Sequence, residues 1–280
     1  MQIHLPQLTT ISQRFLLTGL ILFLLSGCAS VPGPPDERDP FESYNRAMHK
    51  FNTTVDDAVI RPVAETYRDY VPKPVQTGIH NFFDNLQDVI VLLNDVLQFK
   101  FEQAASDLSR LVWNTTLGLF GIFDVATYME LPKHNEDFGQ TLAAWGVPNG
   151  PYLVLPFLGA STVRDAAALP VDIYTHPTFR GLVTDEAVSL ASVGLRFIDL
   201  RANLLSTTEF IDQAAFDPYI FTRDSYLQYR RNLIYDGNPP PEEGPGLEPA
   251  SDKELEMELE LELELEKNNK AKQTNVPPSP

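Results

Sequence analysis

The sequence predicts a mainly helical fold, and three features of the chain lead to that prediction. Apolar residues recur at alternating spacings of three and four over several long segments, which is the period of one helix face. The pairs Asp39-Pro40 and Asp217-Pro218 each combine a capping residue with proline at the first helical position. After residue 27 no segment reaches about 18 consecutive apolar residues, so no helix is expected to cross a bilayer in the usual sense.

Prolines divide the first half of the predicted helical body. A helix is expected to begin after Asp39 as its N-cap, and Arg61-Pro62 is expected to interrupt it. The segment 71–74 stops the chain again, because neither of its prolines can donate within a helix. An apolar stripe then covers about 24 residues, enough for roughly 36 Å as one helix or for two shorter helices. The members of this stripe are Val75, Ile79, Phe82, Leu86, Val89, Leu93 and Val96.

The middle of the chain alternates helices with flexible connections. Residues 102–116 are predicted to be helical and precede an apolar stretch at 117–123 whose glycines make it bendable. Asn135 is expected to cap a helix over 136–145, and Gly146 is expected to end it.

The last third begins with a tight turn at 146–151 and an extended apolar arm over 152–159. Thr162 and Asp165 then form a capping box for the next helix. Two further helices are expected to begin at Asp185 and Asp217.

The N-terminus has the pattern of a bacterial lipoprotein signal peptide. Arg14 precedes the apolar run 15–25, which is too short to span a bilayer, and the run closes with Leu25-Ser26-Gly27-Cys28. Cys28, the only cysteine, is therefore predicted to become the first mature residue and to carry a lipid anchor. The next residues include no Asp beside the cysteine, which is typical of lipoproteins sent to the outer membrane of a Gram-negative envelope.

The folded part of the chain is acidic. The net charge is −17, and the segment from Asp236 onward holds 12 acidic residues against 4 lysines. Subtracting the −8 of this segment and the +1 of Arg14 leaves −10 for residues 28–235. Such a field argues against nucleic acid as a partner and against attraction to anionic headgroups, so membrane contact beyond the anchor has to be apolar.

The C-terminal segment differs in composition from the body. Residues 254–266 alternate Glu with Leu or Met, and because Glu has poor strand propensity and like charges repel, a disordered tail is expected. The predicted organisation is a signal peptide over 1–27, a tether over 28–38, one helical domain over 39–237 and a tail over 238–280.

Residues with catalytic or metal-binding chemistry form no convincing site. His49, His80, His134 and His176 are scattered without HExxH spacing, so no metal is expected. Ser161 lacks the second glycine of a nucleophile elbow, and the chain has no phosphate-binding GxxxxGK[ST] loop. The sequence therefore predicts a protein that is not an enzyme and needs no cofactor. The apolar stripes have two interpretations: from periodicity alone, the interior of a soluble bundle is favoured over helices lying in one leaflet.

A series of short motifs resembles the VacJ/MlaA lipoprotein family, in order, over about residues 25 to 237. Collinearity makes the resemblance more specific than any single motif. Two positions depart from the family pattern: Ala160 stands where proline is common, and Pro148 stands where some members have glycine. The motifs include Asp39-Pro40-Phe41-Glu42, Phe51-Asn52, Arg61-Pro62-Val63-Ala64, Asn114-Thr115-Thr116-Leu117-Gly118, Asp137-Phe138-Gly139-Gln140-Thr141-Leu142, Trp145-Gly146-Val147 and Gly150-Pro151-Tyr152.

The resemblance implies a ring of amphipathic helices with a short hairpin-like loop, lying in the inner leaflet of the outer membrane around a polar-lined passage. It implies removal of mislocalised phospholipid from the outer leaflet, with a trimeric porin and a soluble periplasmic lipid carrier as partners. The opposite face of the striped helices, with Asn85, Asn94 and Asn114, is expected to meet the passage or partners. The alternative is an envelope scaffold that binds porins without moving lipid. Residues assigned to the passage or its gating are Phe51, Asn52, Asn81, Asn85, Gly146 and Gly150, although each also has a purely structural explanation.

Overall fold

The computed structural model describes residues 36–180 and 186–241, and it confirms the mainly helical prediction. Residues up to Gly237 form one compact unit, and Asn238 begins a second. Cys28, Asp185 and the Glu-rich segment lie outside the described residues. The elements are α2 (Glu42–Val55), η1 (Asp56–Ile60), α3 (Arg61–Tyr70), α4 (Lys73–Leu97), α5 (Phe101–Thr116), α6 (Val125–Tyr128), α7 (Phe138–Ala144), β1 (Tyr152–Leu155), β2 (Gly159–Thr162), α8 (Val163–Thr175), α9 (Pro177–Arg180), α10 (Glu186–Ala214) and α11 (Pro218–Ile234).

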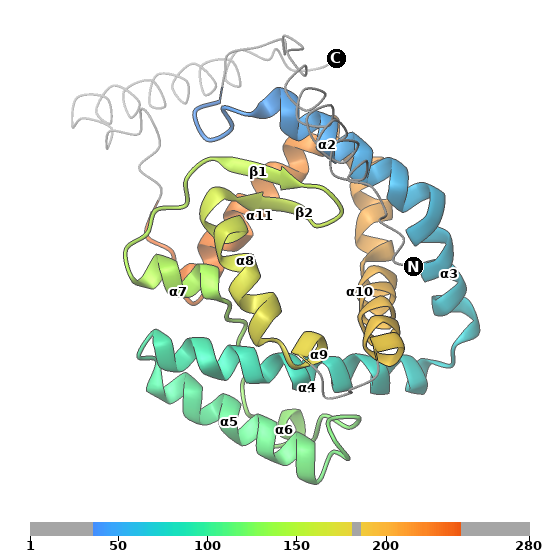
Figure 1. Cartoon of the computed structure of the whole chain (residues 1–280), viewed down its shortest axis with the longest axis vertical. Coiled ribbons are helices and arrows are strands. Elements are labelled where there is room, and N and C mark those ends of the chain that lie inside the picture. Colours follow the sequence, from blue (N-terminus) through green and yellow to red (C-terminus); the bar gives the residue numbers. More distant parts are fainter. Residues whose placement is uncertain (1–35, 181–185, 242–280) are drawn as a thin grey trace, which may run out of the picture. The chain divides into compact units, whose positions relative to one another are not determined.

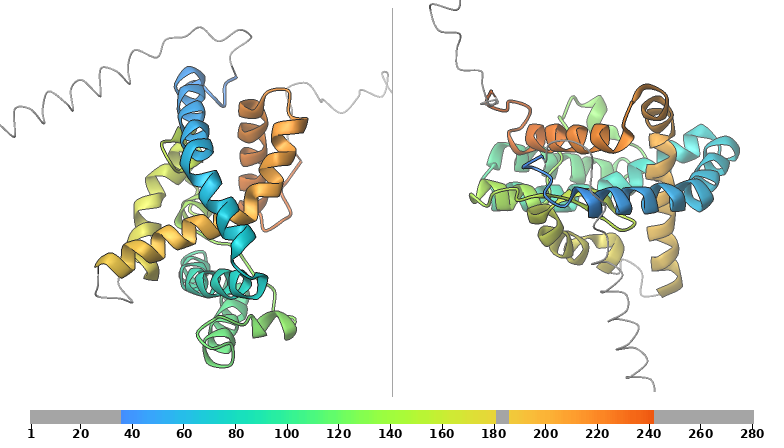
Figure 2. Two further views of the ribbon diagram at one scale, coloured as in Figure 1. Left: turned by 90° about the vertical axis from the view of Figure 1, so that its right-hand side faces the viewer. Right: turned by 90° about the horizontal axis from the view of Figure 1, so that it is seen from above.

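The elements of the first unit contact one another in a closed circuit, which we call the ring (Figure 1). The helices α2, η1 and α3 follow one another along one side, and α3 packs on α10. The circuit continues from α10 to α4, from α4 through α7 and α9 to α8, and from α8 through the β1–β2 hairpin back to α2. Figure 2 shows α10 running across the direction of α2 and α4. The ring implied by the family resemblance is thus observed.

The predicted interruption at Arg61-Pro62 is wrong, because the helix continues from α2 into α3 through η1. This element is a single stretch of π-helix over Asp56–Ile60, which accommodates the change of direction without a break. Pro62 lies in the first turn of α3, where a missing N–H is tolerated. The segment Val71-Pro72, in contrast, ends α3 as predicted.

Helix α4 is one 25-residue helix with a polar buried face. Asn85, Asp88, Asn94 and Asp95 are at most 5% exposed. Four members of the predicted apolar stripe, from Val75 to Val96, are 36–49% exposed. The interpretation of this stripe as the interior of a soluble bundle therefore fails for α4. One residue of this face, Asn94, finds its partner on another helix: its Oδ1 atom accepts from Thr141 Oγ1 at 2.7 Å. None of the described helices has the length and apolarity needed to span a membrane.

Two predicted N-caps are confirmed and two are wrong. Asp217 accepts from the backbone N–H of Tyr219 at 3.0 Å, and Thr162 accepts from Asp165 N–H at 3.2 Å. Asn135 is not the cap of α7, because Asp137 takes that position.

Asp39 does not cap α2 either, since that helix begins at Glu42 after Phe41. Its carboxylate is instead buried, where it accepts hydrogen bonds from Asn45 Nδ2 at 2.7 Å and from the Tyr219 hydroxyl.

The extended apolar arm is the first strand of an antiparallel hairpin. Tyr152 pairs with Thr162 and Leu155 with Gly159, which leaves a three-residue connection at 156–158. The inward side chains of Tyr152 and Val154 pack with Tyr219 of α11 in the buried apolar cluster beside the hairpin.

Candidate functional site

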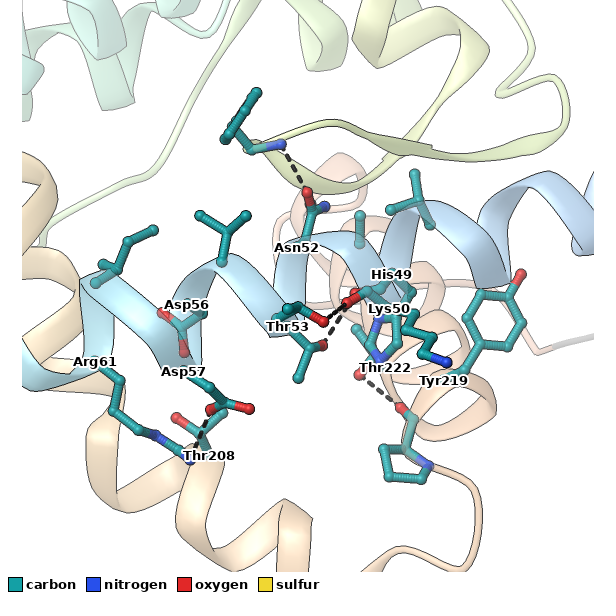
Figure 3. A pocket seen from close by; sticks show the side chains of 18 of the residues that line it. His49, Lys50, Asn52, Thr53, Asp56, Asp57, Arg61, Thr208, Tyr219 and Thr222 are labelled. Carbon is teal, nitrogen blue, oxygen red and sulfur yellow. Dashed lines mark hydrogen bonds and ion pairs between the residues drawn. The ribbon is translucent and has the colours of Figure 1, made fainter. Parts of the chain in front are cut away.

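A cavity of about 820 Å³ lies among the described residues. It is bounded by α2 and η1, by the tip of the β1–β2 hairpin, by α10 and by the start of α11 (Figure 3). Four segments that are distant in sequence therefore meet around one space, which we call the ring cavity.

The hairpin and α10 give the ring cavity apolar walls. Phe157 and Leu158 at the hairpin tip are both about 60% exposed, an unusual exposure for large apolar side chains. Phe197 and Leu204 of α10 contribute further apolar surface. Apolar walls of this kind suit hydrocarbon chains, which are costly to expose to water.

Phe51 and Asn52, two of the predicted site residues, both hold the hairpin tip. The Asn52 Nδ2 atom donates to Leu155 O at 2.9 Å, and the Phe157 N–H donates to Asn52 Oδ1 at 2.7 Å. The Phe51 ring meets the Phe157 ring edge-on, with centroids 5.2 Å apart. Phe157 has a φ of 64°, a conformation that a bulky residue rarely adopts without such support.

Three arginines that line the ring cavity are paired with aspartates. Arg201 of α10 binds Asp56 of η1 through two hydrogen bonds of 2.8 and 2.7 Å, which ties these elements together. Arg61 lies 3.0 Å from Asp57 within the helix.

Arg46 makes the third of these pairs and joins α2 to α11. Its guanidinium lies 2.9 Å from an Asp217 oxygen and stacks over the Tyr219 ring at 4.4 Å. The pKa of the Asp217 carboxyl is lowered. Burial alone would raise this pKa, but hydrogen bonds from the N–H groups at the start of α11 and the charge of Arg46 outweigh that effect.

Asn81 and Asn85 lie apart from the lining of the ring cavity. Asn81 Nδ2 donates to Ile122 O at 3.1 Å, and Asn85 Nδ2 donates to Thr115 Oγ1 at 3.0 Å. A Cβ on Gly121, whose φ is 89°, would lie 2.4 Å from the Asn85 Cβ. The two asparagines therefore hold the 117–123 connection against α4.

Asn94 and Asn114 are likewise buried in helix contacts. Asn94 bonds to α7, and Asn114 Nδ2 donates to Asp124 at 3.0 Å. Neither side chain lines the ring cavity, and the expectation that they meet a passage or partners stays a prediction.

Gly146 and Gly150 are in the connection between α7 and β1. Both have positive φ values, 90° and 66°, which suit glycine. A Cβ on Gly146 would meet open space, whereas one on Gly150 would come within 3.2 Å of the Val163 Cβ. Neither glycine lines the ring cavity.

Sequence reasoning missed the buried ionic contacts that close the ring. Arg230 of α11 is 6% exposed and binds Asp137 of α7 and Asp165 of α8, at 2.6 Å and 2.8 Å. The Tyr226 hydroxyl adds a 2.9 Å bond to Asp165. Of these residues only Asp137 stands in a quoted family motif, and nothing in the local sequence paired it with Arg230, because an Arg in an amphipathic helix ordinarily faces solvent.

The residues considered above as a nucleophile or as metal ligands make hydrogen bonds within the fold. Ser161 is buried on β2, and its hydroxyl donates to Thr162 O at 3.2 Å. His134 bonds to the buried Asp107 at 2.7 Å. Within residues 36–180 and 186–241, no three His, Cys, Asp or Glu side chains are placed to hold a metal ion.

Comparison with known proteins shows the family of the chain. The MlaA lipoprotein model matches residues 37–233. The intermembrane phospholipid transport system lipoprotein MlaA of Escherichia coli K12 is 37% identical over 235 residues, which are 82% of this chain and 92% of the relative. The protein of the same name from Haemophilus influenzae is 34% identical over 80% of this chain and 92% of the relative. A chain from a structural study of how bacterial outer membrane lipid asymmetry is maintained matches with a TM-score of 0.61 and 34% identity, covering 71% of this chain and 99% of that one. The chain therefore belongs to the MlaA lipoprotein family.

Proposed function

We propose that this protein removes mislocalised phospholipid from the outer leaflet of the outer membrane and passes it to a periplasmic carrier, without catalysing a reaction. The observation that carries the proposal is the ring cavity, whose apolar walls and charged wall meet in one space. The names of the relatives, which describe an intermembrane phospholipid transport system, support it.

The physical demand on such a protein is to shield acyl chains from water. A phospholipid with about 30 methylenes costs on the order of 20 kcal/mol to expose, at about 0.8 kcal/mol each. Phe157, Leu158 and Leu204 offer apolar surface for these chains. The protein hydrolyses no nucleotide in this proposal, so lipid moves down a free-energy gradient. The affinity of the acceptor for lipid sets the direction of net transport.

The anchor, the partners and the gating residues are part of the same proposal. Cys28 is the lipid anchor that holds the protein on the periplasmic leaflet of the outer membrane, with a trimeric porin and a soluble lipid carrier as partners. Phe51 and Asn52 set the position of the hairpin tip at the cavity. Gly146 and Gly150 give the connection to β1 its freedom, and Asn81 and Asn85 support the ring from α4.

Filling the ring cavity tests the proposal. Ala160 lines the cavity, so Ala160→Trp is expected to block it, whereas Ala105→Trp adds the same side chain at an exposed site of α5. Each variant is expressed in a Gram-negative strain that lacks its own relative, and outer-leaflet phospholipid is measured with an impermeant amine-reactive label. We expect A105W to restore asymmetry and A160W, at equal protein level and thermal midpoint, to fail. Full restoration by A160W would instead favour a scaffold that binds porins.

A further inference from the structure

The wall of the ring cavity formed by α2 carries one positive charge that no carboxylate among the described residues neutralises. Lys50 lines the cavity, and among residues 36–180 and 186–241 it makes no ion pair. The other cations of the lining are held by Asp217, Asp57 and Asp56, as described above. The lining thus has a surplus of one positive charge, whereas residues 28–235 together carry −10.

His49, beside Lys50, offers a second donor. Figure 3 shows the side chains of His49, Lys50, Tyr219 and Thr222 gathered between α2 and α11. Burial lowers the pKa of His49, so at neutral pH its ring is uncharged and keeps one N–H. In the part of the chain that the structure describes, the ring makes an edge contact with Tyr219 and no hydrogen bond.

An uncompensated ammonium beside a free ring N–H is a site for an oxyanion. Lysine is a compact cation with three donors and binds phosphate as a point charge. The same cavity has apolar walls from the hairpin and α10, which a free inorganic anion does not need. An amphiphile with a phosphodiester satisfies both.

We infer that Lys50, assisted by His49, binds the phosphodiester of the transported lipid while the acyl chains lie against the apolar walls. This inference rests on the proposed function and adds the recognition of the headgroup to it. Because the contact is with the phosphate, lipids with different alcohols on that phosphate are expected to bind alike, and diacylglycerol is expected to bind more weakly.

The test compares two lipids with identical chains. Full-length protein in detergent is titrated with dioleoyl phosphatidylglycerol and with dioleoylglycerol, each competing with a fluorescent phospholipid. For the unmodified protein we expect the phospholipid to bind about fivefold more tightly, the size of a charge-assisted contact near the surface. Lys50→Met is expected to bring this ratio of affinities close to one, because it weakens the binding of the phospholipid and not that of the diacylglycerol. Lys50→Arg is expected to restore most of the fivefold preference.

Lys73→Met is the matched control. Lys73 lies at the start of α4, outside the lining of the cavity, where its ammonium donates to Gln76 at 3.3 Å. We expect K73M to keep the ratio of the unmodified protein. A ratio in K50M equal to that in K73M would overturn the role of Lys50.

The remaining outcomes separate the inference from the function on which it rests. If neither lipid binds, the proposed function itself fails. If both lipids bind equally to the unmodified protein, lipid carriage stands and headgroup recognition is overturned. A further outcome is that inorganic phosphate also displaces the fluorescent phospholipid at the concentrations at which unlabelled phospholipid displaces it. That result would identify a free anion as the ligand and contradict the lipid assignment.

Discussion

The amide of Asn52 shows how one side chain can set the position of a whole hairpin. Both of its polar atoms are used, one as donor to Leu155 O and one as acceptor from the Phe157 N–H. The conformation at Phe157 is unfavourable on its own, so the hairpin tip depends on this amide from α2.

Substitutions of Asn52 should separate its two bonds. Asn52→Asp keeps the acceptor for the Phe157 N–H and loses the donor, whereas Asn52→Ala loses both. We expect N52A to lower the free energy of unfolding by about 1–3 kcal/mol and to expose the Phe157 amide to hydrogen exchange. N52D should leave that amide protected. Equal exchange at Phe157 in the unmodified protein and both variants would show that the tip is held by other contacts.

A buried carboxyl on α4 predicts how stability depends on pH. Asp88 is 1% exposed, and burial raises its pKa to about 6. Because the folded pKa lies above the unfolded one, the folded state binds the proton more tightly, and stability falls as pH rises from about 4 to about 6. We expect Asp88→Asn to remove about 2 kcal/mol of this fall.

Urea unfolding of the unmodified protein and D88N at pH 4, 5 and 6.5 measures the difference. Asp69→Asn is the control, because Asp69 is exposed and Arg68 lowers its pKa, so it titrates below this window. Parallel stability curves for the unmodified protein and D88N would refute a buried, protonated Asp88.

At the scale of elements, α10 is fastened to two other helices through one carboxylate. Asp199 is 2% exposed and accepts from Tyr67 Oη of α3 at 3.0 Å and from His80 Nδ1 of α4 at 2.8 Å. The hydrogen bond to Asp199 is the largest contribution that raises the pKa of His80, so this contact is strongest when the imidazole is charged.

Loosening this contact should affect α10 more than its neighbours. We expect Asp199→Asn to speed hydrogen exchange in the middle of α10 and to leave α5 unchanged, because α5 packs on the other side of α4. Tyr67→Phe removes the same contact from the α3 side and should give a smaller effect with the same distribution. Uniform acceleration across the protein in D199N would indicate global destabilisation instead.

At the scale of the whole molecule, local patterns predicted the elements but not how they close. Spacing and turn residues located α5, the hairpin arm and the starts of α8 and α11, because these depend on neighbours in sequence. The polar interior of α4 could not be predicted, since its hydrogen-bond partners come from α5 and α7. Asp39 was misassigned for the same reason, because an Asp-Pro pair indicates a cap unless a distant Tyr219 and Asn45 take the carboxylate.

The candidate site likewise combines residues that the sequence predicted with contacts that it could not predict. Phe51 and Asn52 were found through the family motif. Asn52 lines the ring cavity and Phe51 packs on Phe157 of the hairpin tip, whereas the charged pairs across the cavity join residues more than 140 positions apart. Ring closure itself depends on Arg230 with Asp137 and Asp165.

Replacing Arg230 should therefore weaken the entire ring. Arg230→Gln leaves the partly buried Asp137 without its cation and Asp165 with only Arg164, and we expect a loss of about 3 kcal/mol in the free energy of unfolding. Arg68, which is half-buried and pairs with the exposed Asp69, is the control, and Arg68→Gln should leave stability nearly unchanged. An R230Q protein as stable as R68Q would mean that α7, α8 and α11 are held by apolar packing alone.

Capture of lipid at a cavity residue tests most directly whether the ring cavity holds phospholipid. A photo-reactive amino acid is placed at Leu204, which lines the cavity, or at Asp69, which is exposed on α3, and attached lipid is identified by mass spectrometry after irradiation of cells. We expect phospholipid on the Leu204 variant, background on the Asp69 variant, and loss of the Leu204 adduct when Ala160→Trp fills the cavity. Folded, membrane-located protein that captures no phospholipid at Leu204 would contradict the claim.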